Sequence, residues 1–134
     1  MRIRRVLFLT SAQPSCLQFM VRDLAHGFRR LGLDVEIVRF HDGGPEDPGK
    51  LMRALATFQP DAVFQMDHLR SESPKAWAPG PVYISWLQDS LPNLYKQEVI
   101  DGINGSDVIL TSFPGLKERL GTVGYPAERV HHLP

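Results

Sequence analysis

Short apolar runs of strand length, separated by segments long enough to form helices, constrain the fold of this chain more than any other feature. Apolar runs of about four to eight residues are typical of strands buried on both faces of a sheet. We therefore expect strands in each of these runs and a last short strand near the end of the chain. The expected strands cover residues 6–9, 35–38, 61–66, 82–87, 107–111 and 130–133.

The segments between these runs carry helix signals. Ser15 is placed as the N-cap of a first helix, and Gln18 lies at capping-box spacing behind it. Apolar residues follow at helical spacing as far as Leu31, and Gly32 supplies a stop. Pro48 is suited to the first position of a second helix.

Three later segments complete the pattern. A helix is expected over residues 94–100, and another from Pro114 to Leu120, capped by Gly121. Residues 67–79 are polar and are expected to form a loop, with one short helical turn near Ala76 and Trp77.

Alternating strands and helices predict an α/β fold. We expect a single doubly wound, Rossmann-like domain over residues 1–134, with a mainly parallel sheet of about six strands flanked by helices. The length is that of a common single domain. Ligands of such sheets bind beyond the carboxyl ends of the strands, which directs attention to the loops at 11–15, 67–73, 88–92 and 112–115.

Composition excludes several classes of function. Lysine plus arginine and aspartate plus glutamate number 15 each, so the net charge is zero and no nucleic-acid partner is indicated. No apolar stretch approaches the roughly 20 residues of a membrane span, and the run at 6–9 is too short for a signal peptide. The single cysteine, Cys16, favours a reducing, cytoplasmic setting and is interpreted as a small buried packing residue.

Two groups of polar residues follow expected strands and are candidates for catalysis. Asp67 and His68 could act as a base or bind a hydroxyl group; alternatively, the aspartate caps a turn and the histidine is a surface residue. Trp86, Gln88 and Asp89 suit sugar binding through an aromatic face and polar hydrogen bonds. Here the alternative is a tryptophan in the core and an aspartate that caps a turn.

Other candidates lie at the expected starts of helices. The loop containing Ser11, Gln13 and Ser15 ends at a helix N-terminus, which favours an anion or a hydroxyl-rich ligand. It lacks the glycine patterns that cradle a pyrophosphate, and a plain turn with an N-cap is the alternative. Ser112 could contact a ligand or cap the next helix. His131 and His132 face opposite ways on a strand, so no metal site is expected.

Several segments together resemble the N-terminal domain of GT-B glycosyltransferases, of the family-4-like or spore-maturation type. The first strand is followed by a helix that ends in a Leu-Gly-x-x-Val pattern and by a second strand, as in the opening of that family. The resemblance covers nearly the whole chain, and its segments are residues 6–11, 28–35, 58–63, 84–89, 106–112 and 124–130.

The resemblance implies a sugar transfer from a nucleotide-sugar donor to an acceptor, which is a sugar, a lipid-linked molecule or a protein. This domain would contribute the acceptor side and hold no cofactor. The donor would bind mainly to a C-terminal domain of the same chain beyond Pro134, so the isolated domain is expected to be inactive. The family's glycine-rich acceptor loop is replaced here by Ser11-Ala12-Gln13-Pro14. The catalytic candidates are Asp89, His68 and Asp67, and the substrate-binding candidates are Ser11, Gln13, Ser15, Gln88 and Ser112.

Two alternatives from other classes remain. Residues 59–67 look like the third strand of a response-regulator receiver domain, with Asp67 as the phosphoacceptor. A receiver also needs acidic residues after its first strand and a lysine after its fifth, where this chain has Thr10-Ser11 and Thr111-Ser112. A binding module without catalytic activity is the second alternative, because fold alone does not specify function.

Overall fold

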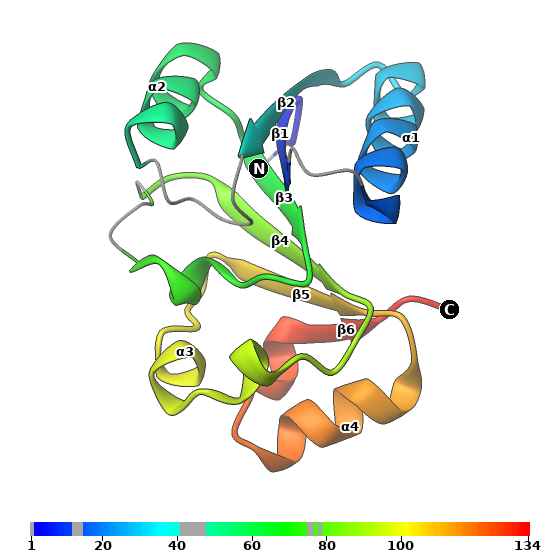
Figure 1. The fold of residues 1–134 in the computed structure, drawn as a ribbon, viewed down its shortest axis with the longest axis vertical. Coiled ribbons are helices and arrows are strands. Elements are labelled where there is room, and N and C mark those ends of the chain that lie inside the picture. Colours follow the sequence, from blue (N-terminus) through cyan, green and yellow to red (C-terminus); the bar gives the residue numbers. More distant parts are fainter. Residues whose placement is uncertain (1, 12–14, 41–47, 75–76, 78) are drawn as a thin grey trace. The chain divides into compact units, whose positions relative to one another are not determined.

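The computed structural model describes residues 2–11, 15–40, 48–74, 77 and 79–134, and it confirms the α/β fold with a parallel sheet (Figure 1). The strands follow the order β2-β1-β3-β4-β5-β6. They are β1 (Arg5–Ser11), β2 (Asp34–Phe40), β3 (Ala62–Met66), β4 (Val82–Leu87), β5 (Asp107–Thr111) and β6 (Val130–His132). The helices are α1 (Cys16–Arg30), α2 (Pro48–Phe58), α3 (Gln97–Asp101) and α4 (Pro114–Thr122), with 3-10 turns η1 (Arg70–Glu72), η3 (Pro92–Tyr95) and η4 (Ala127–Arg129).

The chain divides into two compact units. The first unit comprises Met1–Phe64 and Ala76–Pro81, and the second comprises Gln65–Lys75 and Val82–Pro134. The boundary falls inside β3, so the residues that follow this strand belong to the second unit. In the described part of the chain, no helix is both long and apolar enough to cross a membrane.

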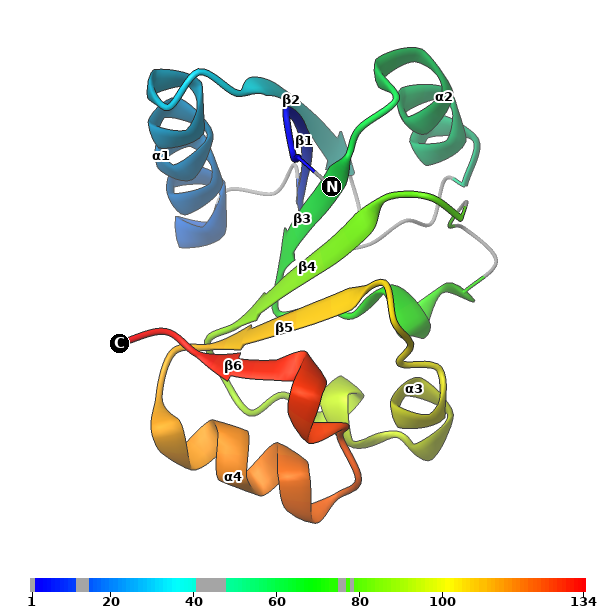
Figure 2. The same ribbon diagram turned by 180° about the vertical axis from the view of Figure 1, so that it is seen from behind.

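In the first unit, β1 pairs in parallel with β2 on one side and with β3 on the other. Helices α1 and α2 lie on opposite sides of these strands (Figures 1 and 2). The central position explains why β1 reads as a continuous apolar run: its residues from Val6 to Leu9 are all buried. The ring of Phe8 lies 5.3 Å from that of Phe28 in α1 and 5.0 Å from that of Phe64 in β3.

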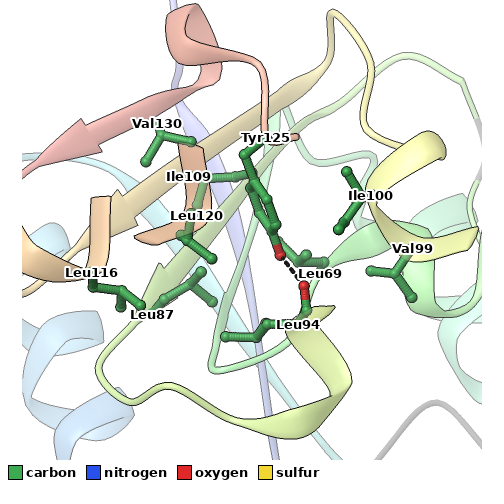
Figure 3. Close-up of a cluster of buried hydrophobic side chains, with 10 residues drawn as sticks. All are labelled: Leu69, Leu87, Leu94, Val99, Ile100, Ile109, Leu116, Leu120, Tyr125 and Val130. Carbon is green, nitrogen blue, oxygen red and sulfur yellow. Dashed lines mark hydrogen bonds between the residues drawn. The ribbon is translucent and has the colours of Figure 1, made fainter. Parts of the chain in front are cut away.

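In the second unit, α3 and α4 lie on the same side of strands β4, β5 and β6 (Figure 2). This side holds a cluster of buried apolar residues (Figure 3): Leu69, Leu87, Leu94, Val99, Ile100, Ile109, Leu116, Leu120, Tyr125 and Val130. Burial alternates along β4 and β5, and the residues between the buried ones are half-buried. These two strands therefore bury one face more completely than the other.

The expected helix over residues 94–100 is interrupted. Lys96 has an extended backbone (φ −75°, ψ 128°) and separates η3 from α3. Leu94, Val99 and Ile100 all enter the buried cluster. Residues five and six positions apart lie on different sides of a continuous helix, so the break is what lets all three side chains reach the same core.

Helix boundaries also differ from expectation at the caps. The capping box of Ser15 and Gln18 is wrong: the Ser15 side chain makes no capping hydrogen bond, and the Gln18 amide donates to the Ser11 carbonyl instead, at 2.9 Å. The N-cap of α4 is Phe113 rather than Ser112, and this helix continues past Gly121 to Thr122. Gly32 does end α1 in the left-handed region (φ 83°), as expected.

Two further expectations need correction, and a third falls on residues outside the described part of the chain. Cys16 is exposed rather than buried, because it begins α1 on the solvent side. Trp86 is half-buried, not core, because the cluster lies on the other face of β4. Within the loop after β3 the structure forms η1 at Arg70–Glu72; Ala76 lies outside the described residues.

Replacing Tyr125 by phenylalanine is expected to lower the free energy of unfolding by about 1–2 kcal/mol. The Tyr125 hydroxyl donates to the carbonyl of Leu94 at 2.8 Å inside the buried cluster (Figure 3), and the variant leaves this carbonyl without that donor. Urea unfolding measures the effect. Tyr95→Phe is the matched control, because Tyr95 is half-buried and its hydroxyl partner, Ser90, can turn to water. Equal losses of unfolding free energy in Tyr125→Phe and Tyr95→Phe would show that the buried hydrogen bond of Tyr125 adds no stability.

Candidate functional site

Asp67 joins the ends of β3 and β4. Its N–H donates to the Trp86 carbonyl at 2.9 Å, and its carboxylate accepts the N–H of Gln88 at 2.7 Å. Asp67 is 6% exposed and has a left-handed backbone (φ 57°), a conformation that aspartate tolerates better than most residues. The carboxylate is thus directed at a backbone N–H rather than at solvent.

The turn at Asp67 brings three polar side chains together, which we call the His68 cluster: His68, Glu72 and Asn93. His68 Nδ1 lies 3.2 Å from Glu72 Oε1, and the Asn93 amide donates to the same oxygen at 2.9 Å. The other Glu72 oxygen accepts the N–H of Leu69 at 2.5 Å. The His68 side chain is 49% exposed and that of Glu72 is 18% exposed. A held carboxylate therefore orients a histidine that remains open to solvent.

The protein favours the charged forms of both His68 and Glu72. The hydrogen bond to Glu72 raises the pKa of His68, although partial burial opposes this, and the carboxylate of Asp67 adds to the rise. Burial acts to raise the pKa of Glu72, but the hydrogen bonds from His68, Leu69 and Asn93 outweigh it and the pKa is lowered. A histidine whose Nδ1 is bound by a carboxylate can use Nε2 to accept a proton from a hydroxyl group.

The stability that this pair contributes is expected to depend on pH. The raised pKa of His68 means that its contribution is complete below its ordinary pKa of 6.5 and is lost as pH rises through the folded value. The lowered pKa of Glu72 means that its contribution is complete above 4.5 and is lost as pH falls through the folded value. The window of full contribution therefore lies between these two values.

The measurement is the difference in unfolding free energy between the wild type and His68→Ala across about pH 4 to 8. We expect this difference to be largest between the ordinary pKa values of 4.5 and 6.5. His26→Ala, at an exposed histidine of α1, is the control. A difference that increases toward pH 8 would contradict the proposed ion pair.

The remaining candidates of the second unit are spread over two strand ends. Gln88 follows β4 and is held through its backbone by Asp67, whereas Asp89 is exposed. Ser112 follows β5, and its hydroxyl oxygen accepts the indole N–H of Trp86 at 2.9 Å. The structure thus brings Asp67, His68 and Gln88 together, while Ser112 is engaged by the tryptophan.

The candidates after β1 belong to the first unit and are described separately. Ser11 is half-buried, and its carbonyl accepts the Gln18 amide. The hydroxyl of Ser15 is buried and has no hydrogen-bond partner among the described residues, and the same holds for the hydroxyl of Thr10 at the end of β1. Gln13 lies outside the described residues.

Sequence reasoning missed two members of the His68 cluster. Glu72 follows His68 by four residues, a spacing that signals contact across a helical turn and could have suggested the pair. No local signal points to Asn93, which lies 21 residues from Glu72 in sequence.

Comparisons with known proteins identify the fold. No protein-family model and no curated protein matches the chain. Among solved structures, the chain is similar to a leucine-binding protein, LivK, of Thermotoga maritima MSB8, with a TM-score of 0.55 and 18% identity. The match covers 94% of this chain and 43% of that chain, so this chain spans less than half of the solved protein. At this identity the similarity supports the α/β fold alone.

Proposed function

We propose that this chain is the acceptor-side, N-terminal domain of a GT-B glycosyltransferase that transfers a sugar from a nucleotide-sugar to an acceptor hydroxyl. The observation that carries the proposal is the 3.2 Å contact between His68 Nδ1 and Glu72 Oε1 beyond the carboxyl end of β3. Parallel α/β sheets bind ligands at this edge. His68 would take the proton of the acceptor hydroxyl at Nε2, and Glu72 would position its ring.

The surroundings of the His68 cluster support a polar, hydroxyl-bearing ligand. Gln88 is half-buried and Asp89 exposed, and both follow β4, whose end Asp67 joins to the end of β3. Amide and carboxylate groups of this kind form hydrogen bonds with sugar hydroxyls. The donor and a further C-terminal domain that binds it belong to the same proposal, as does a cytoplasmic location.

Histidine side-chain NMR during titration with sugars tests this proposal. Glucose and related monosaccharides are expected to shift the His68 ring signals at millimolar concentrations and to leave those of His26 in α1 unchanged. UDP-glucose is expected to bind this domain weakly. Binding of UDP-glucose with a Kd of about 1 μM would place the donor here and contradict the assignment. A response to leucine but to no sugar would instead support an amino-acid-binding lobe.

The positioning role of Glu72 has its own readout. In Glu72→Gln, the pKa of His68, followed by its ring signals, is expected to fall, because the carboxylate hydrogen bond is the main cause of its rise. Sugar-induced shifts of the His68 ring should weaken in the same variant. Glu98→Gln, at an exposed glutamate in α3, is the control. An unchanged pKa of His68 in Glu72→Gln would rule out this role.

A further inference from the structure

Among the described residues, no side chain caps the N-terminus of α1, where the Gln18 N–H donates to the Ser15 carbonyl at 3.2 Å. This helix is 15 residues long, has no acidic residue in its first turn, and receives no capping hydrogen bond from the side chain of its N-cap, Ser15. Free N–H groups and the helix dipole give such an end a partial positive charge. It therefore favours a negatively charged group, provided that other donors converge there.

Two buried hydroxyls lie at this end of the helix, and neither has a hydrogen-bond partner in the part of the chain that the structure describes. Thr10 is 9% exposed and its Oγ1 makes no hydrogen bond, and the Oγ of Ser15 is likewise buried and unpaired. A buried polar group without a partner costs about 1–3 kcal/mol, so most such groups are satisfied by protein, water or a bound molecule. Two unsatisfied hydroxyls next to an uncapped helix N-terminus point to a ligand.

The geometry of β1 directs Thr10 toward α1. Phe8 lies two residues earlier, on the same face of the strand, and its ring packs edge-on against Phe28 of α1. The hydrogen bond from Gln18 to Ser11 places the first turn of α1 at the carboxyl end of β1. Thr10 therefore lies beneath the beginning of the helix.

The strand order and a nearby positive charge also favour a ligand site at the carboxyl end of β1. The connection that follows β1 leads to β2 on one side of it, whereas the connection that follows β3 leads to β4 on the other side. Doubly wound sheets bind ligands at such a switch in direction. Arg39 of β2 is the register partner of Thr10, extends from the same face of the sheet, and is exposed. It adds positive charge at this edge of the first unit.

We propose that Thr10, Ser15 and the N-terminal N–H groups of α1 bind the oxyanion of a phosphoryl group. A phosphoryl group presents several acceptor oxygens in different directions, which suits two hydroxyl donors and a helix end, whereas a neutral ligand gains nothing from the dipole. The site goes beyond the proposed function, because it gives the first unit a phosphoryl-bearing ligand of its own.

Titration with inorganic phosphate at constant ionic strength, followed by backbone NMR, tests the site. Phosphate is expected to bind with a Kd of about 1 mM and to shift the amide signals of the first turn of α1. Thr10→Val should weaken this binding at least about tenfold, or 1.4 kcal/mol. Its unfolding free energy should be unchanged or higher, because valine replaces an unpartnered hydroxyl with a methyl group of similar size.

Thr111→Val is the matched control, because Thr111 is also buried in a strand but belongs to the second unit. It should leave phosphate affinity unchanged. Ser15→Ala should weaken phosphate binding in the same direction as Thr10→Val. Absence of binding at tens of millimolar phosphate, or equal weakening by Thr10→Val and Thr111→Val, would overturn the proposal.

Glucose 1-phosphate and glucose separate this site from the proposed function. Tighter binding of glucose 1-phosphate than of glucose, with a preference that Thr10→Val removes, supports the phosphoryl site. Glucose-induced shifts at His68 without any effect of phosphate would overturn the site and leave the proposed function standing. Phosphate binding that depends on Thr10, without any sugar response at His68, would support the site and count against the proposed function.

Discussion

Asp107→Ala is expected to destabilise the protein by about 3–5 kcal/mol, because it leaves a buried guanidinium without its counter-ion. Arg70 and Asp107 are 8% and 5% exposed. Two hydrogen bonds join them, from Nε to Oδ1 at 2.9 Å and from Nη2 to Oδ2 at 2.8 Å. The variant also removes the acceptor of the Asn104 N–H. Urea unfolding followed by circular dichroism measures the loss.

Two variants test whether burial causes this effect. Asp23→Ala breaks the contact between Arg22 and Asp23, whose side chains are 64% and 76% exposed, and should change stability by less than about 0.5 kcal/mol. The double variant Arg70→Met/Asp107→Leu should recover much of the loss, because no charge is then buried. If Asp107→Ala lost no more stability than Asp23→Ala, the buried pair would have no structural role.

Leu116→Ala is expected to destabilise the protein by about 2–5 kcal/mol through loss of apolar burial and creation of a cavity. Leu116 lies on α4, is 0% exposed and belongs to the buried cluster of the second unit (Figure 3). The urea concentration at the midpoint of unfolding should fall, while the slope of the unfolding free energy against urea concentration stays constant.

Leu31→Ala is the control for this substitution. Leu31 follows α1 and is 79% exposed, so its truncation should cost less than about 0.5 kcal/mol. Comparable losses at the two leucines would show that Leu116 does not pack as described.

The strands were predictable because their signals are local. A continuous apolar run such as Val6–Leu9 needs burial on both sides, and β1 receives it from its position between β2 and β3. The ends of the helices were less predictable, because packing in the buried core determines where they fall. The break at Lys96 lets residues on both sides of it enter one cluster, and neither helical spacing nor propensity contains that information.

The candidate site was predictable only in part. The position of Asp67 and His68 after an apolar run marked them as candidates, since strand ends are visible in sequence. Their contacts were not predictable, because they depend on the left-handed backbone of Asp67. This conformation directs the Asp67 carboxylate to the Gln88 N–H and places His68 beside Glu72.

Alternating strands and helices with a parallel sheet follow from the order of residues alone, because apolar periodicity is set by neighbours along the chain. Contacts between groups that are distant in sequence arise only when the chain is folded. Arg70 and Asp107 are 37 residues apart, and Glu72 and Asn93 are 21 apart, so their pairing depends on how strand ends and turns are placed in space. The same holds for the unpaired hydroxyls beneath α1, because burial without a partner is a property of the folded chain alone.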